Sequence, residues 1–139
     1  MSAVNYSLEA RYLIGAGGGS FPGLIVAVEK PTVPTGSLEI RAELDSGAEY
    51  SLFDGEVATA IGLDLFSGKP FTFDTTSGAT IDARILRIVL RHVELGTFEL
   101  PLRFSTGKIF RNILGRDFFD LIQIGFRERH LMVFLEAAP

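Results

Sequence analysis

The sequence has no cysteine, no tryptophan and only two histidines, His92 and His130. The absence of cysteine excludes disulfides, thiolate metal sites and a cysteine nucleophile. Two histidines are too few for a histidine-rich metal cluster, and we interpret both as strand or surface residues. We therefore expect this chain to use neither a metal nor another cofactor.

Long apolar runs and an excess of positive charge are also missing. The longest apolar stretches fall far short of the roughly 20 residues that cross a membrane. Residues 1–11 lack the basic segment and apolar core of a signal peptide. The formal net charge is -4, which gives no field to attract nucleic acid or anionic lipid. We expect a cytoplasmic protein that binds neither nucleic acid nor membranes.

The residues that are present provide enough apolar material for one globular domain. The chain has 139 residues, 47% of them hydrophobic, and 12 Phe; folding a chain of this length buries roughly two-thirds of its surface. Alternating and β-branched segments between glycines and prolines predict an all-β fold. The expected strands are 24–28, 38–44, 71–75, 98–104 and 131–135.

One long segment, residues 81–93, fits two secondary structures. Arg84, Arg87 and Arg91 fall at helical spacing, which is typical of a basic amphipathic helix. The segment also contains several β-branched residues and has no N-cap before it, which favours a strand. We predict a strand here.

Two further segments carry local signals. Residues 15–20 are glycine-rich, and because Phe and Pro follow them rather than a helix start, a link or hairpin is favoured over a dinucleotide-binding loop. A short helix is expected over 56–61, with Asp54 as its N-cap and Gly62 at its end.

The segment with the clearest chemistry is Asp45-Ser46-Gly47-Ala48, directly after the predicted strand 38–44. Alone, Asp-Ser-Gly also makes an ordinary turn. A second element, Ile113-Leu114-Gly115-Arg116-Asp117, follows the predicted hairpin at 71–81 and precedes the last strand. The combination of the two, in this order, is much more specific than either one.

These two elements resemble the retropepsins, the single-domain aspartic proteases of retroviruses and their cellular and bacterial relatives. The resemblance runs from about residue 24 to residue 135. Residues 1–20 match nothing, and we treat them as an N-terminal extension of unknown role before a domain at 21–139. The resemblance implies a retropepsin-like closed barrel with a flap hairpin and one or two short helices, which is half of a dimeric acid protease.

The resemblance also implies roles for individual residues. Asp45 would be the catalytic residue, and its loop would be supported by Ser46, Gly47, Ala48, Ile113, Leu114 and Gly115. The flap over the substrate would carry Thr75, Thr76, Ser77 and Gly78. Glu49 and Arg116 would form an ion pair, which is worth only about 0 to 1 kcal/mol if exposed. Asp117 and Asp120 are expected to cap the helix turn or face solvent.

The implied activity is that of an aspartic endopeptidase. Each subunit of a homodimer would supply one Asp45, and two carboxylates about 3 Å apart share one proton, so one acts as base and the other as acid on an attacking water. Roughly pH 3 to 6 should favour that state. The substrate would be a peptide or protein segment bound as an added strand, its side chains entering mainly apolar pockets.

Two alternatives remain open. The predicted flap tip has one glycine where retroviral flaps have several. This difference and residues 1–20 point to a catalytically silent module of the same fold that binds peptides or mediates dimerisation. Asp74-Thr75-Thr76-Ser77-Gly78 superficially resembles a second copy of the aspartate motif. It lies too close to Asp45 in sequence to belong to a second lobe, so we favour a polar flap.

Overall fold

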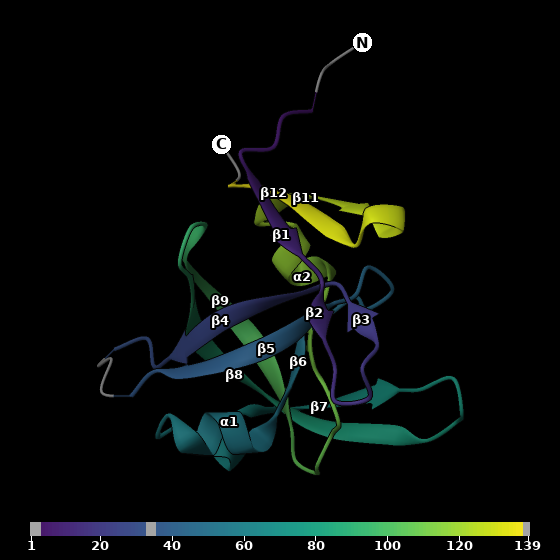
Figure 1. Cartoon of the computed structure of the whole chain (residues 1–139). Coiled ribbons are helices and arrows are strands. Elements are labelled where there is room, and N and C mark those ends of the chain that lie inside the picture. Colours follow the sequence, from purple (N-terminus) through teal and green to yellow (C-terminus); the bar gives the residue numbers. More distant parts are fainter. Residues whose placement is uncertain (1–3, 33–35, 138–139) are drawn as a thin grey trace.

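The computed structural model describes residues 4–32 and 36–137, and its main feature is a closed barrel of six strands (Figure 1). The strands follow one another in the order β4, β5, β10, β6, β9 and β8, and β8 pairs again with β4 to close the ring. A further strand, β7, pairs with the outer edge of β8. The bounds are β4 Gly23–Glu29, β5 Leu38–Leu44, β6 Leu52–Asp54, β7 Lys69–Asp74, β8 Thr80–His92, β9 Gly96–Ser105 and β10 Asn112–Leu114. The predicted all-β fold is confirmed.

Period-two alternation explains why these segments form the barrel. In β5, Ile40, Ala42 and Leu44 are at most 9% exposed, while the intervening side chains lie on the outer face. Inward side chains of the other strands meet them around the fully buried Phe53 and Phe104, whose rings are 6.3 Å apart. Burial of aromatic and aliphatic side chains is the main favourable term for such a fold.

The ambiguous segment 81–93 is a strand, as predicted. β8 pairs with β7, β9 and β4, so tertiary pairing overrides the helical spacing of its arginines. Each of these arginines forms an ion pair on the barrel surface: Arg84 with Asp82, Arg87 with Glu99, and Arg91 with Glu29.

The two α-helices are short. α1 spans Gly55–Ala60, where the sequence predicted 56–61, and the Asp54 side chain caps it by accepting a hydrogen bond from Glu56 N at 2.9 Å. Gly62 ends it with a φ of 87°, which favours glycine. α2 spans Arg116–Phe119, and the 3-10 turns η1 and η2 span Leu65–Ser67 and Glu128–His130. No helix in the described part of the chain has the length and apolarity needed to cross a membrane.

A separate three-stranded sheet covers one end of the barrel above α2 (Figure 1). Its order is β1 (Leu8–Arg11), β12 (Met132–Ala137), β11 (Ile122–Arg127), so β12 is central and pairs on both sides within one chain. The glycine-rich segment 15–20 is the turn of a hairpin between β2 (Leu13–Ile14) and β3 (Ser20–Phe21). The proposed boundary between residues 20 and 21 stays a prediction.

Candidate active site

Asp45 lies where β5 leaves the barrel, at the start of a tight turn. Its backbone N–H donates to Leu114 O at 3.0 Å, and Ala48 N–H donates to the carbonyl of Asp45 at 3.2 Å. Gly47 N–H donates to Asp45 Oδ1 at 2.8 Å. Within the described residues, Oδ2 has no hydrogen-bond partner. The half-buried carboxylate therefore has one oxygen held by the backbone and one available to another group.

The strand end β10 joins this turn to the barrel. It runs parallel to β5, with Ile113 opposite Glu43 and Leu114 opposite Leu44, and antiparallel to β6 through Ile113 and Leu52. Leu114 is fully buried. The two sequence elements that predicted the site are thus adjacent in the fold.

Gly115, which follows β10, packs directly against the loop that carries Asp45. A Cβ atom at this position would lie 2.6 Å from Ala48 O and 2.9 Å from the carbonyl carbon and oxygen of Tyr50. These are backbone atoms that cannot rotate away, so only glycine fits without displacing the loop.

The first turn of α2 holds the same loop through backbone hydrogen bonds. Arg116 N–H donates to Ala48 O at 2.8 Å, and Asp117 N–H donates to Glu49 O at 3.2 Å. Two amide groups that have no partner inside the helix are thereby satisfied. The start of α2 therefore fixes the position of the active-site loop.

A buried network behind the loop was not predicted from the sequence. Ser51 is fully buried; its N–H and its hydroxyl both donate to Asp117 Oδ1, at 2.9 and 2.6 Å, and its Oγ accepts from Gly115 N–H at 2.9 Å. Asp117 Oδ1 also accepts from Phe118 N–H at 2.8 Å, which agrees with the expected role in the helix turn. The network ties the aspartate loop, β10 and α2 together.

A guanidinium group that lies over two nearly perpendicular rings borders this network. The Arg103 Cζ atom lies 3.6 Å from the centroid of the Tyr50 ring and 4.2 Å from that of Phe71. Burial lowers the pKa of Arg103, and the neighbouring Tyr50 and the carboxylates of Asp117 and Glu49 partly oppose this. The contact links β9 to the loop after Asp45 and to β7.

The predicted ion pair between Glu49 and Arg116 does not form within the described chain. Both side chains are exposed, and such a pair gains little free energy to hold two long side chains in one geometry. The Glu49 carboxylate instead acts on Arg103, where it is one of the groups that oppose the lowering of the pKa by burial. Sequence spacing alone gave no signal for this partner.

The predicted flap residues form the turn of the β7–β8 hairpin. Thr75 N–H donates to Ala79 O at 3.0 Å, Gly78 N–H donates to Thr75 O at 3.0 Å, and the Thr75 and Ser77 hydroxyls are 3.0 Å apart. Gly78 has a φ of 85°, and Thr76, Ser77 and Gly78 are exposed. The hairpin projects away from the barrel (Figure 1), while Phe71 near its base contacts Tyr50 at 5.5 Å between centroids.

The other residues predicted for the site differ in their exposure and place in the fold. Ser46 and Gly47 are exposed, Ala48 and Ile113 are half-buried, and Asp120 is exposed at the end of α2. Asp74 ends β7 opposite Thr80, in a hairpin rather than in a second aspartate loop. Among the described residues, no three His, Asp or Glu side chains are grouped closely enough to hold a metal ion.

Comparisons with known proteins agree with this geometry. The family model for aspartyl proteases matches residues 31–118, which include Asp45 and Gly115. The chain is similar to the crystal structure of a retropepsin-like aspartic protease from Rickettsia conorii, with a TM-score of 0.62 and 19% identity over 91% of this chain and 98% of that one. It also matches EIAV protease complexed with the inhibitor HBY-793, with a TM-score of 0.49 and 19% identity over 84% and 92% of the two chains. No curated protein matches the sequence.

Proposed function

This chain belongs to the aspartyl protease family and has the retropepsin-like fold, and we propose that it is an endopeptidase whose active site is shared by two copies of the chain. The observation that carries the proposal is the state of Asp45. Its Oδ1 accepts a hydrogen bond from Gly47 N–H, and Oδ2 has no partner in the described residues. One chain offers one such aspartate loop, and the chemistry needs two.

The proposed mechanism uses the pair of Asp45 carboxylates. At about 3 Å apart they cannot both ionise readily, so they share one proton. The ionised member takes a proton from a water that attacks the peptide carbonyl, and the protonated member donates to the carbonyl oxygen. The same groups then protonate the leaving amine. The backbone N–H of Gly47 holds one oxygen of each carboxylate in place throughout.

The order of the terminal sheet constrains how two copies would meet. Along Met132–Leu135, β12 already has β1 on one side and β11 on the other, so in the described chain this stretch has no free edge for a partner. A sheet shared between copies would have to extend from β1 or β11. The expected strand 131–135 would then contribute to a dimer contact only through its side chains.

The β7–β8 hairpin is the proposed cover for the substrate. A peptide in extended conformation would bind between the hairpin turn and the Asp45 loop, with its main chain forming hydrogen bonds as an added strand. The contact between Phe71 and Tyr50 joins the base of this hairpin to the floor of the site.

Cleavage of a diverse peptide library at about pH 3 to 6 tests the proposal. The wild-type chain is expected to cut peptides internally, and Asp45→Asn, which keeps the shape but removes the titrating carboxyl, is expected to lower the rate by at least about a thousandfold. Asp120→Asn is the matched control, because Asp120 is exposed and its side chain forms none of the hydrogen bonds that hold the Asp45 loop. Cleavage that survives Asp45→Asn would contradict the proposal, and a dimer that binds peptides without cutting any would favour the silent module.

A further inference from the structure

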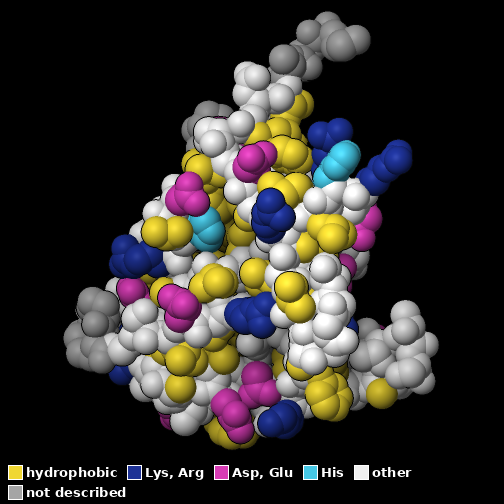
Figure 2. Space-filling view, in the orientation of Figure 1, with side chains coloured by type: hydrophobic (Ala, Val, Ile, Leu, Met, Phe, Trp, Pro, Cys, Tyr) yellow, Lys and Arg dark blue, Asp and Glu magenta, His cyan; other side chains and the backbone are white. Residues whose placement is uncertain are grey.

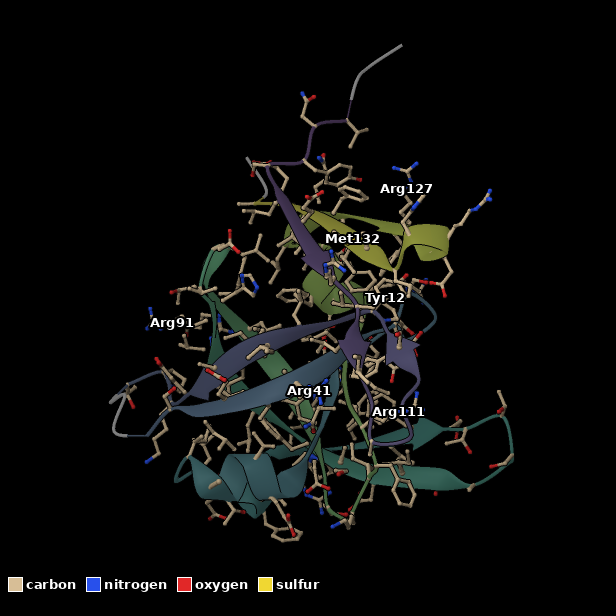
Figure 3. The ribbon with its side chains drawn as sticks, viewed as in Figure 1. Tyr12, Arg41, Arg91, Arg111, Arg127 and Met132 are labelled. Atoms are coloured by element: carbon tan, nitrogen blue, oxygen red, sulfur yellow. The ribbon has the colours of Figure 1, made fainter. Side chains whose placement is uncertain are left out.

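A cavity of about 770 Å³ lies beside the proposed catalytic loop. Four parts of the chain line it: the β2–β3 hairpin, Pro22 just after it, the outer face of β5, and the start of β10 with the two residues before it. The side chains that matter for its chemistry are Arg41, Glu43, Phe110, Arg111 and Asn112. Figure 3 labels Arg41, on β5, and Arg111, just before β10, both next to the β2–β3 hairpin.

The cavity is within reach of a peptide held at Asp45. Glu43 precedes Asp45 by two positions, and strand residues rise about 3.3 Å each, so the two are about 7 Å apart along the chain. Side chains at alternate positions of a strand share a face, and Arg41 and Glu43 lie on the outward face of β5. This distance matches one or two residues of an extended substrate.

The charges in the cavity are unbalanced. Arg111 Nη1 donates to both oxygens of Glu43, at 2.9 and 3.2 Å, and this uses the one carboxylate among the lining residues. The Arg111 side chain is 70% exposed, so much of its guanidinium group still faces the cavity or solvent. Arg41 Nη2 donates to Ile14 O at 2.6 Å, and its Cζ lies 5.7 Å from the Phe21 ring centroid. Two guanidinium groups against one carboxylate leave a net charge of about +1.

The surface around the cavity does not account for the positive charge of the cavity. Figure 2 shows basic side chains scattered over this face, several of them beside acidic ones, without a continuous basic patch. The chain as a whole has a formal net charge of -4. The cavity therefore carries a local positive charge on a chain that is negative overall, and a planar guanidinium donor suits a carboxylate.

We propose that this cavity binds an acidic side chain, Asp or Glu, of the peptide substrate, at a position within two residues of the cleaved bond. The inference rests on the proposed proteolytic function and replaces the expectation of mainly apolar pockets for this one position. It also gives part of residues 1–20 a role, because the turn of the β2–β3 hairpin forms one wall. Arg111 is the specificity-determining residue, since its side chain lines the cavity and only its Nη1 is used by Glu43.

Matched peptides that differ only in Glu, Gln or Lys at each position near the cleaved bond test the inference. At about pH 5.5 the substrate Glu is ionised, and at one position kcat/KM is expected to be about fivefold higher for Glu than for Gln, and lower again for Lys. Arg111→Gln is expected to abolish the difference between Glu and Gln. Glu43→Gln removes the competing carboxylate and is expected to increase the difference in kcat/KM between Glu and Gln peptides. High salt should weaken the preference.

Arg87→Gln is the matched control, because Arg87 forms a comparable exposed ion pair with Glu99 outside the cavity. It is expected to leave the Glu to Gln ratio unchanged. Binding of the same peptides to the Asp45→Asn variant, followed by fluorescence anisotropy, separates recognition from cleavage. Cleavage or binding that is equal for Glu and Gln at every position would overturn the inference while the protease assignment stands. A wild-type chain that cuts none of these peptides, while the Asp45→Asn variant still binds the Glu peptides more tightly, would instead contradict the proposed function.

Discussion

Single residues of the candidate site act mainly by fixing backbone. Gly115 allows β10 to contact the loop that follows Asp45, and Ser51 uses both its N–H and its hydroxyl to hold Asp117 behind that loop. Neither residue is placed against the proposed reacting atoms. Each is a positioning residue, so its replacement should affect stability and activity together.

Gly115→Ala is expected to lower the free energy of unfolding by about 1 to 3 kcal/mol, because the added Cβ would meet backbone atoms 2.6 to 2.9 Å away. Protease activity should fall further, because the loop that carries Asp45 must shift. Urea unfolding measures the first effect. Gly107→Ala is the control, since nothing lies within 4 Å of a Cβ at that position; equal stability of the two variants would contradict the account.

Ser51→Ala tests the buried network. The substitution leaves the N–H of Gly115 without its acceptor and removes one donor to the Asp117 carboxylate, both in the interior. We expect a loss of about 1 to 3 kcal/mol in unfolding free energy. Ser67→Ala removes a hydroxyl hydrogen bond of equal length at an exposed site and should change stability by less than about 0.5 kcal/mol. A neutral Ser51→Ala would show that the network does not stabilise the fold.

At the scale of elements, the hairpin between β8 and β9 contains a titratable turn. His92 Nδ1 accepts hydrogen bonds from Glu94 N–H at 3.2 Å and from Leu95 N–H at 3.1 Å. Burial lowers the pKa of His92, and the nearby carboxylate of Glu94 partly opposes this. The neutral ring is the form that caps the turn, because protonated Nδ1 cannot accept.

This arrangement predicts that the fold loses stability as the pH falls. Because the pKa of His92 is lower in the folded than in the unfolded chain, the unfolded chain binds more protons just below about pH 6.5. His92 then stabilises the fold above that pH and ceases to do so below it. His92→Asn keeps an acceptor without titrating, so urea unfolding at about pH 5 and pH 8 should show a smaller difference than in wild type. The same slope in both proteins would exclude this role, with His130→Asn as the control.

Elements with a strong local pattern could be predicted from the sequence. The predicted strand 38–44 has the same bounds as β5, and the predicted helix 56–61 differs from α1 by one position at each end. Both were predictable because alternation and an Asp cap are local signals. The strands β1 and β6 were missed, because they have only four and three residues and pair with distant partners. The strand β11 was also missed, although it pairs with the nearby β12. The contact of Ser51 with Asp117 spans 66 positions, so no spacing rule could reveal it.

At the scale of the whole molecule, the start of the chain is tied to its end. β1 pairs with β12, Tyr12 N–H donates to Leu131 O at 2.9 Å, and the Tyr12 hydroxyl donates to Glu128 Oε2 (Figure 3). Tyr12 is only 7% exposed. The terminal sheet is therefore held both by backbone pairing and by a buried phenol.

Burial, with the hydrogen bond and the charge of Glu128, raises the pKa of Tyr12 to about 12. Because the folded chain holds this proton more tightly than the unfolded chain does, the contribution of Tyr12 to stability is complete below about pH 10 and declines as the pH rises to about 12. Tyr12→Phe should remove this alkaline slope in urea unfolding. At pH 7 it should lower stability by about 1 kcal/mol through the lost hydrogen bond. An unchanged slope above pH 10 would contradict this assignment.

In the proposed enzyme, two chains share one active site. Mixing wild-type and Asp45→Asn subunits tests this sharing. If the subunits pair at random, an equal amount of the variant leaves half of the wild-type chains in wild-type dimers, so the cleavage rate from a fixed amount of wild type should fall to about half. A threefold excess should lower it to about a quarter. Adding Asp120→Asn instead should cause no decrease. A cleavage rate that stays constant as the Asp45→Asn variant is added, after subunit exchange has been verified, would show that each chain carries a complete site and would contradict the account.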